Sequence, residues 1–351
     1  MSDYLEKTDD DAGKPNPVVN ALSNAVAAVR ADDDQLALAK AHEGLHPKAI
    51  EKLSVEEARL QPTAADAVNA LLQQQGRSTL PETLVPGVTS QDTTVDGATG
   101  PLPARIYTPS GTAPFPVIVY FHGGGWVIAD KEVYDGGARG LAKEANAIVV
   151  SVDYRQAPEH KFPAAWDDAL AAYRWVATNA ASLGGDPARI ALAGESAGGN
   201  LAVATAVAVR DTPNLTRPLH VLSVYPVAQT SLNTESYLEN AIAKPLNRAM
   251  VAWFVDKLIN SEEDLKDTRL SLIDANLSGL PPVTIINARL DPLRSDGAKL
   301  EDALREAGVP VERQSYEGVA HEFFGAAAVL EKARDAQAFA GQRLRSAFSA
   351  V

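Results

Sequence analysis

From about Val88 to the C-terminus, short apolar segments rich in β-branched residues alternate with longer segments of helical periodicity. Several of the short segments, such as Val117–Phe121 and Ile148–Val152, are almost continuously apolar, which is typical of parallel strands covered on both faces. The predicted strands are Thr93–Val95, Ala104–Tyr107, Val117–Phe121, Ile148–Val152, Ile190–Ala193, Val221–Tyr225, Val283–Asn287 and Val311–Tyr316. The predicted helices are Ala164–Ala181, Ala197–Val209, Asp296–Ala307 and Ala327–Phe348. This alternation predicts an α/β fold in which helices flank a mostly parallel sheet of these eight strands.

Two segments do not follow the alternation. Residues 1–78 have apolar residues at helical spacing and are divided by prolines, which predicts three short helices. The clearest run of that spacing is Val18, Leu22, Val26 and Val29. Between the strands that end at Tyr225 and begin at Val283, only the helices Thr234–Asn240 and Asn247–Leu258 are predicted. An insertion of this kind commonly forms a lid over a site.

Charge and residue usage exclude several classes of function. The 351-residue chain has a formal net charge of -13, which disfavours binding to nucleic acid or to an anionic membrane. It has no cysteine, so disulfides, thiolate metal ligands and a cysteine nucleophile are ruled out. The acidic start, Met1–Asp11, lacks the pattern of a secretory signal, and no apolar run is long enough to span a bilayer. We therefore expect a cytoplasmic protein without membrane or nucleic-acid partners.

A Gly-x-Ser-x-Gly sequence at residues 194–198 joins a predicted strand to a predicted helix. A serine on such a sharp turn projects its hydroxyl above the sheet, and the small residues on either side let the backbone pass closely. The pattern alone is only a modest signal, because an incidental serine in a tight turn would also produce it. Its position between strand and helix predicts that Ser196 is a nucleophile.

A His-Gly-Gly-Gly sequence, residues 122–125, directly follows the strongest predicted strand. Acyl transfer develops negative charge on the former carbonyl oxygen, and inward-facing backbone N–H groups can stabilise it. A phosphate-binding loop is the rival interpretation, but neither a Gly-Lys-Ser/Thr sequence nor Gly-x-Gly-x-x-Gly spacing is present. The loop therefore predicts an oxyanion hole.

The general base and its orienting acid can be selected by elimination. With a nucleophile on this kind of turn, the acid and then the histidine follow the serine in the chain. Only His220 and His321 follow Ser196, and His220 lies at the start of a predicted strand. His321 lies after the last strand, where a loop can reach the serine. Asp291 lies just past the next-to-last strand and is the predicted acid, whereas its neighbour Asp296 looks better as a helix cap.

These residues together resemble the hormone-sensitive-lipase-like esterases, the family IV group of the α/β-hydrolases. The resemblance runs from about Val88 to the C-terminus. It rests on Phe121-His122-Gly123-Gly124-Gly125-Trp126, Asp153-Tyr154-Arg155, Ala157-Pro158-Glu159-His160, Phe162-Pro163-Ala164, Gly194-Glu195-Ser196-Ala197-Gly198-Gly199-Asn200, Asp291-Pro292-Leu293 and His321-Glu322-Phe323.

The resemblance implies an α/β-hydrolase fold with a helical cap and a Ser196–His321–Asp291 triad. It implies that the backbone N–H groups of Gly123 and Gly124, with that of Ala197, form the oxyanion hole. It also implies hydrolysis of short-chain acyl esters without a metal or organic cofactor, and a possible homodimer. The cap would be formed by residues 1–78 and by 228–275, the latter inserted in a catalytic domain of residues 79–351.

Three residues depart from the usual family pattern. Glu195 stands where aspartate is commoner, Gln156 where leucine is usual, and Glu322 where glycine is usual. None of the three removes a catalytic group. For Glu195 we expect a buried structural role.

The remaining polar and aromatic residues of the motifs have more than one interpretation. Tyr154, Arg155, Glu159 and His160 are predicted to form a structural clamp beneath the glycine loop, and His160 lacks a partner for a metal site. Trp126 and Phe323 are candidate substrate contacts, although a core role for Trp126 is equally compatible with its position.

The sequence thus predicts a serine carboxylesterase that hydrolyses short-chain acyl esters through an acyl-enzyme. Two alternatives remain open. An amidase or deacetylase could use the same machinery, and a ligand-binding receptor could retain the fold without catalysis, although such a receptor would not need His321.

Overall fold

The computed structural model describes residues 30–350. Its centre is one eight-stranded sheet with the order β1-β2-β4-β3-β5-β6-β7-β8. The strands are β1 (Val88–Asp96), β2 (Pro101–Pro109), β3 (Phe115–Phe121), β4 (Ile148–Val152), β5 (Gly185–Glu195), β6 (Val221–Val224), β7 (Val283–Leu290) and β8 (Val311–Ala320). β2 pairs antiparallel with β1 and with β4, and all pairs from β4 to β8 are parallel. The predicted α/β-hydrolase fold class, with its mostly parallel eight-stranded sheet, is confirmed.

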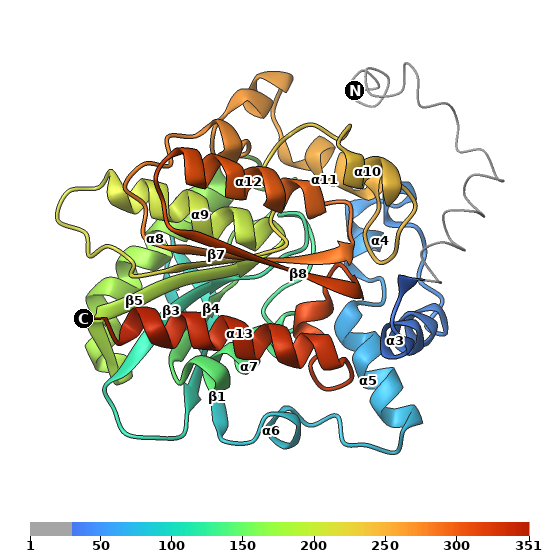
Figure 1. Cartoon of the computed structure of the whole chain (residues 1–351), viewed down its shortest axis with the longest axis horizontal. Coiled ribbons are helices and arrows are strands. Elements are labelled where there is room, and N and C mark those ends of the chain that lie inside the picture. Colours follow the sequence, from blue (N-terminus) through green and yellow to red (C-terminus); the bar gives the residue numbers. More distant parts are fainter. Residues whose placement is uncertain (1–29, 351) are drawn as a thin grey trace.

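Helices cover both faces of this sheet (Figure 1). α8 (Ala164–Asn179), α9 (Ala197–Arg210) and α12 (Arg294–Glu306) cover one face, and α7 (Asp135–Ala145) and α13 (Glu331–Phe348) cover the other. All seven residues of β3 are buried, because helices pack against both of its faces. The continuous apolar character of the central strands is explained by this burial.

α7 is a helix that the sequence analysis did not predict. It contains Gly136, Gly137 and Gly140, and glycine is a poor helix former. The glycines are needed by close packing: a side chain at Gly136 would meet the backbone of Gly325, and one at Gly140 would meet Gln337. Tertiary contacts therefore stabilise a helix that local propensity disfavours.

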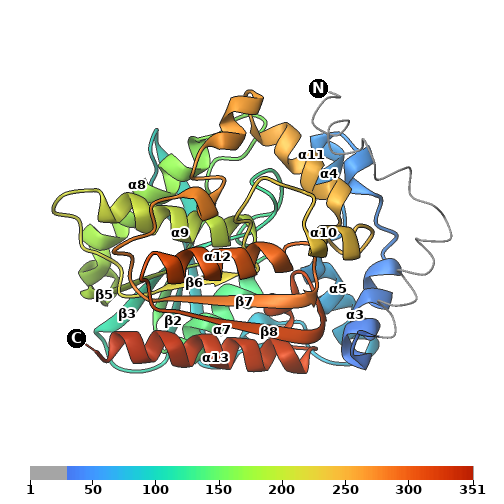
Figure 2. The same ribbon diagram turned by 45° about the horizontal axis from the view of Figure 1, so that its top comes forward.

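Further helices lie before the sheet and in the long insertion. The described N-terminal segment contains α3 (Asp33–Glu43), α4 (Val55–Arg59), α5 (Ala64–Gln74) and α6 (Pro81–Leu84). The predicted helical run from Val18 to Val29 lies outside the described residues. The insertion between β6 and β7 contains α10 (Glu235–Glu239) and α11 (Arg248–Leu258). Figures 1 and 2 show that α4, α10 and α11 gather near one end of the sheet.

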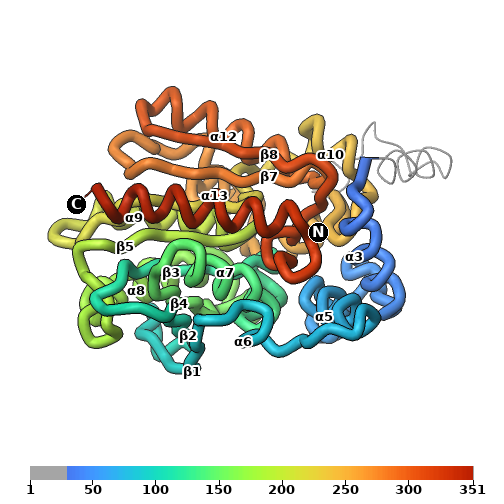
Figure 3. Tube along the Cα trace, turned by 60° about the horizontal axis from the view of Figure 1, so that its bottom comes forward, coloured from blue at the N-terminus to red at the C-terminus, as the bar shows by residue number. Residues whose placement is uncertain are grey.

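The carboxyl ends of the parallel strands lie at the same end of the sheet. Figure 3 shows α3 and α5 on this side of the molecule, beyond the end of α13. Because parallel strands have their carboxyl ends on the same side of a sheet, the loops that follow β3, β5, β7 and β8 meet there. These are the four loops that contain the predicted functional residues.

Candidate active site

Ser196 is the single residue between β5 and α9, at a backbone conformation of φ 57° and ψ -117°. A non-glycine residue rarely adopts this conformation, and such strain is characteristic of functional positions. A side chain at Gly198 would overlap the carbonyl oxygen of Phe121, the last residue of β3. The glycine therefore allows the turn to press against the loop that follows β3.

The three residues predicted as a triad are in hydrogen-bond contact. His321 Nε2 lies 3.0 Å from Ser196 Oγ, and His321 Nδ1 lies 2.8 Å from Asp291 Oδ2. All three side chains are buried. The carboxylate can only accept, so Nδ1–H donates to Asp291 and leaves Nε2 free to accept the serine proton.

The surroundings of His321 favour its protonated form. Burial alone would lower the pKa of this histidine, but the negative charges of Asp291, Glu322 and Glu195, together with the Asp291 hydrogen bond, raise it above 6.5. The ring of Tyr225 packs against the imidazole at a centroid distance of 4.5 Å. The site therefore stabilises the imidazolium that proton transfer from Ser196 would produce.

The glycine loop presents backbone donors that have no hydrogen-bond partner in the part of the chain that the structure describes. Gly124 and Gly125 have φ values of 94° and 60°, a region that favours glycine. Within residues 30–350, the N–H groups of Gly123, Gly124 and Ala197 form no hydrogen bond. A side chain at Gly123 would also approach the carbonyl oxygen of Glu195, so the loop runs beside the serine turn. The N–H groups of Gly123 and Gly124 on the loop and that of Ala197 on the serine turn are therefore available to a ligand.

Side chains hold the carbonyl groups of the loop. Tyr154 OH donates to the carbonyl oxygen of His122 at 2.8 Å, as expected for the predicted clamp. Gln156 Nε2 donates to the carbonyl oxygens of Ile128 and Ala129, at 3.0 and 2.7 Å. In a trans peptide group the C=O and N–H point in opposite directions, so the contact of Tyr154 with the His122 carbonyl also fixes the direction of the Gly123 N–H.

Arg59 was missed by the sequence analysis, although it contacts the same loop. Its Nε donates to the carbonyl oxygen of Val127 at 2.9 Å, and Nη2 donates to that of Ala157 at 3.0 Å. Its guanidinium also forms a bidentate ion pair with Glu159. No local sequence signal distinguishes Arg59, which ends the short helix α4.

The other residues of the predicted clamp have separate roles. Arg155 forms an ion pair with the buried Asp168, with 2.8 Å between Nε and Oδ2. His160 is exposed, and its backbone N–H donates to the carbonyl oxygen of Gln156 at 2.9 Å. Within the described residues its imidazole forms no hydrogen bond or ion pair.

The prediction that Asp296 caps a helix is wrong. The residue lies in the first turn of α12 and is fully buried, and the N-cap position is occupied by Leu293. Its carboxyl accepts from the backbone N–H of Ala228 and from the side chain of Gln229, both at 3.0 Å. Burial raises the pKa of Asp296 to about 7. Its location next to the Asp291 loop is a tertiary feature that the pattern of a cap residue did not reveal.

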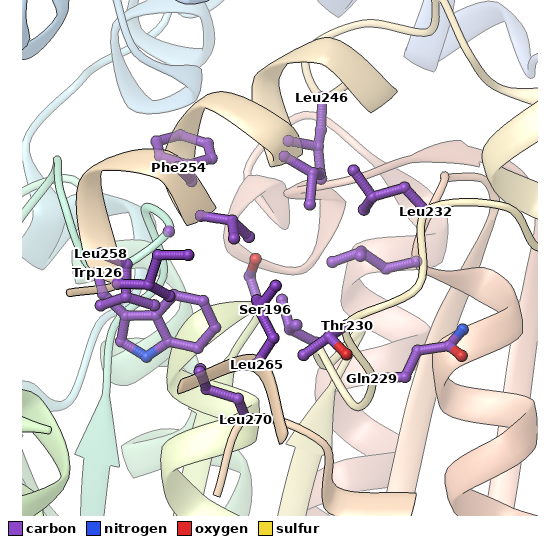
Figure 4. A pocket seen from close by; sticks show the side chains of 16 residues that line it. Trp126, Ser196, Gln229, Thr230, Leu232, Leu246, Phe254, Leu258, Leu265 and Leu270 are labelled. Carbon is purple, nitrogen blue, oxygen red and sulfur yellow. The ribbon is translucent and has the colours of Figure 1, made fainter. Parts of the chain in front are cut away.

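Two cavities meet at Ser196. One has a volume of about 30 Å³ and is almost entirely apolar. Figure 4 shows the Ser196 hydroxyl directed into this pocket, with Trp126 to one side and Phe254 and Leu246 above it. Its lining combines residues of the sheet loops with residues of the insertion, the latter including Leu246, Val251, Phe254, Val255, Leu258, Ile259, Leu265 and Leu270. We call this cavity the apolar pocket.

The second cavity, which we call the cleft, has a volume of about 570 Å³ and is more polar. Its lining includes Ser196, His321 and Glu322, and residues of the N-terminal helices such as Arg59. His321 lines the cleft but not the apolar pocket. The two cavities share residues that include Gly125, Ser196 and Phe254, and they differ in that the catalytic candidate His321 lines only the cleft.

Of the two candidate substrate contacts, the structure places only one in a cavity. Trp126 lines the apolar pocket and stacks on Trp166 at a centroid distance of 5.2 Å. Phe323 is buried between Tyr225 and Tyr316 and lines neither cavity.

Within residues 30–350, no group of three or more histidine, aspartate or glutamate side chains is placed to hold a metal ion. None of the described helices has the length and apolar character needed to cross a bilayer.

Comparison with known proteins agrees with this geometry. A family model described as alpha/beta hydrolase fold matches residues 118–325. The chain is similar to the carboxylesterase NlhH of Mycobacterium tuberculosis, with 43% identity over 281 residues that cover 78% of this chain and 88% of the relative. It is also similar to an arylesterase of Saccharolobus solfataricus, with 36% identity over 235 residues that cover 64% of this chain and 73% of the relative.

Solved structures of esterases have the same architecture. An esterase of Pyrobaculum calidifontis matches with a TM-score of 0.76 at 35% identity, over 87% of this chain and 97% of that structure. A thermostable esterase from Pseudomonas putida ECU1011 matches with a TM-score of 0.79 at 28% identity, over 91% of this chain and 98% of that structure.

Proposed function

Since the chain belongs to the hormone-sensitive-lipase-like (family IV) esterases of the α/β-hydrolases and is a carboxylic ester hydrolase, we propose that it acts on short-chain acyl esters through Ser196, His321 and Asp291. The observation that carries this proposal is the unbroken series of contacts from Asp291 through His321 to Ser196. The strained backbone at Ser196 and the raised pKa of His321 support it.

The proposed first half-reaction forms an acyl-enzyme. Ser196 Oγ attacks the ester carbonyl carbon while His321 Nε2 takes the hydroxyl proton. The carbonyl oxygen becomes an oxyanion, and the tetrahedral intermediate collapses by breaking the bond to the alcohol oxygen. His321 returns its proton to that oxygen, which leaves as the alcohol. Asp291 holds the tautomer of His321 throughout and stabilises the imidazolium.

In the second half-reaction water takes the place of the alcohol. His321 accepts a proton from the water as its oxygen attacks the acyl carbon, and then donates that proton to Ser196 Oγ when the acid is released. In both halves we assign the oxyanion to the N–H groups of Gly123, Gly124 and Ala197. Their lack of partners supports this assignment, and each such donor typically contributes about 3–4 kcal/mol to the transition state.

The two cavities suggest where the two parts of the ester bind. His321 must protonate the leaving alcohol, and it lines the cleft but not the apolar pocket. We therefore assign the alcohol to the cleft and the acyl chain to the apolar pocket. A volume of about 30 Å³ corresponds to roughly two water molecules by the measure used for small cavities, which supports a short acyl chain.

We extend the proposal to the organisation of the chain. Residues 79–351 would form the catalytic domain, and residues 1–78 and 228–275 would form the cap. The contribution of the insertion to the apolar pocket and of Arg59 to the cleft supports this division.

The test of the nucleophile is Ser196→Ala. We expect kcat for p-nitrophenyl acetate to fall by on the order of 10³ or more, because the remaining groups can only polarise the ester. Circular dichroism should show an unchanged fold, and a fluorophosphonate probe should label the parent protein but not the variant. Full esterase activity in the folded variant would exclude the proposed mechanism.

A further inference from the structure

Glu322, which directly follows His321, has a left-handed backbone conformation with φ 66° and ψ 10°. This conformation is comfortable for glycine and unfavourable for a residue with a side chain. Strain of this kind persists where the surrounding structure imposes it, and it is concentrated at functional sites. Because glycine would suit this backbone conformation better, the presence of a glutamate side chain at this position needs a separate explanation.

The carboxylate of Glu322 is half-buried and lines the cleft together with Ser196 and His321. Its Oε1 accepts a hydrogen bond from Tyr134 OH at 3.0 Å, which fixes the orientation of the carboxylate. Among residues 30–350, no lysine, arginine or histidine side chain forms an ion pair with it. Within the described residues, the negative charge of Glu322 thus has a neutral hydrogen-bond partner and no cationic one.

The cationic side chains of the cleft are neutralised by other groups. Arg59 is paired with Glu159, and Arg155 is paired with Asp168. The carboxylate of Asp153, which also lines the cleft, is paired with Lys131. The charge of Glu322 is therefore not offset by the neighbouring arginines, and the net charge of -13 adds to the attraction of cations.

We propose that Glu322 determines the specificity of the leaving-group side, by favouring esters whose alcohol carries a positively charged amine. This inference rests on the proposed function, in which the alcohol occupies the cleft. A cationic group there would lie near the carboxylate of Glu322, where partial exclusion of water strengthens their attraction.

The test compares two acetate esters of nearly equal shape. In 2-(dimethylamino)ethyl acetate the alcohol carries a protonated amine, and in 3-methylbutyl acetate a CH group replaces that nitrogen. The quantity measured is the ratio of kcat/KM for the cationic ester to kcat/KM for the neutral ester, at neutral pH and low salt. We expect Glu322→Gln, which keeps an acceptor for Tyr134, to lower this ratio by about tenfold, as for the loss of a close partly buried charge.

The ratio isolates specificity from the effect of Glu322 on the general base. Glu322 helps to raise the pKa of His321, but this effect changes the rates for both esters equally and cancels in the ratio. In the parent protein, added salt should lower the ratio toward that of the variant, because ions screen the attraction. If Glu322→Gln does not fold, Glu322→Gly removes the same charge at a backbone conformation suited to glycine.

Glu82→Gln provides the matched control, because Glu82 is exposed on α6, lines neither cavity and changes the net charge equally. Its ratio should equal that of the parent protein. A ratio for Glu322→Gln within twofold of the parent value would overturn the inference. Hydrolysis of the neutral ester that does not depend on Ser196 would instead contradict the proposed function, so the two failures are distinguishable.

Discussion

Glu195, the residue before Ser196, has a carboxylate enclosed at the centre of the molecule. It is buried, and it accepts hydrogen bonds from the hydroxyl groups of Tyr120 and Tyr225. A side chain at Gly137 on α7 would overlap this carboxylate, so the glycine makes room for it. The network links β3, β5 and the segment after β6 directly beneath the serine, so the buried carboxylate has hydrogen-bond partners on the segments of two neighbouring strands.

Burial of Glu195 makes the stability of the protein depend on pH. Burial raises the pKa of Glu195 from 4.5 to about 7, although the two tyrosine hydrogen bonds lower it in part. Between these two values the folded state binds the proton and the unfolded state does not. The contribution of Glu195 to stability is therefore most favourable below about pH 4.5 and is lost as the pH rises through 7.

We predict that the free energy of unfolding of the parent protein, relative to that of Glu195→Gln, decreases between pH 5 and pH 8. The decrease should be on the order of 3 kcal/mol, because each pKa unit corresponds to about 1.4 kcal/mol. Urea unfolding of both proteins at the two pH values measures it, and titrating groups that do not interact with Glu195 cancel in the difference. A difference between the proteins that does not change with pH would show that Glu195 does not titrate in this range.

At the scale of elements, short helices position the catalytic loops. α10 contacts the Asp291 loop from the insertion: Ser236 Oγ donates to the carbonyl oxygen of Pro292, and Asn240 Nδ2 donates to that of Asp291. On the same helix, Glu239 forms ion pairs with Arg289 and with Arg294, on either side of the loop.

α4 has a comparable relation to the glycine loop, through Arg59. The guanidinium of Arg59 donates four hydrogen bonds, to the carbonyls of Val127 and Ala157 and to both carboxylate oxygens of Glu159, whereas a lysine ammonium has only three donors. The N-terminal segment is therefore joined directly to the loop that presents the unpaired N–H groups.

We predict that Arg59→Lys lowers kcat for p-nitrophenyl acetate by roughly tenfold with little change in KM, because small displacements of catalytic groups reduce the rate strongly. Glu159→Gln is the matched control. It leaves the bonds from Arg59 to the Val127 and Ala157 carbonyls in place and removes only an exposed ion pair, so its kcat should stay close to that of the parent. Equal kcat values in the two variants would show that the backbone contacts of Arg59 do not position the loop.

At the scale of the whole molecule, the apolar pocket exists only because separate parts of the chain close around Ser196. Trp126 follows β3, whereas Phe254 and Leu265 belong to the insertion, 128 and 139 residues later in the chain. The volume that limits the acyl chain therefore depends on how the insertion packs against the sheet domain.

We predict that kcat/KM on p-nitrophenyl esters falls by about tenfold or more from butanoate to decanoate. Leu265→Ala should move the preferred acyl chain toward longer chains, because three carbon atoms are removed from a half-buried part of the lining. Leu60→Ala is the control, since Leu60 is 79% exposed and lines neither cavity. A flat profile out to long chains would contradict the assignment of the acyl chain to the apolar pocket.

Much of this architecture could be predicted from the sequence, because its signals are local. The apolar strands, the serine turn and the glycine loop each depend on residues within a few positions of one another. Parallel pairing then implies that loops after β3, β5, β7 and β8 share one edge, so Ser196, Asp291 and His321 could be selected before any contact was known. Asp296 shows the limit, because a cap residue and a buried carboxyl have the same local pattern.

Only the tertiary structure determined what joins these loops. Arg59 reaches Val127 across 68 positions of the chain, and Glu195 meets Tyr120 across 75. Such contacts depend on how the helices pack and not on any local preference, so no periodicity predicts them. The same holds for the division of the space around Ser196 into an apolar pocket and a cleft, and for the strained backbone that directs Glu322 into the cleft. The sequence therefore determined the fold and the candidate catalytic residues. The packing of distant segments determined the shape and charge of the two cavities that a substrate would enter.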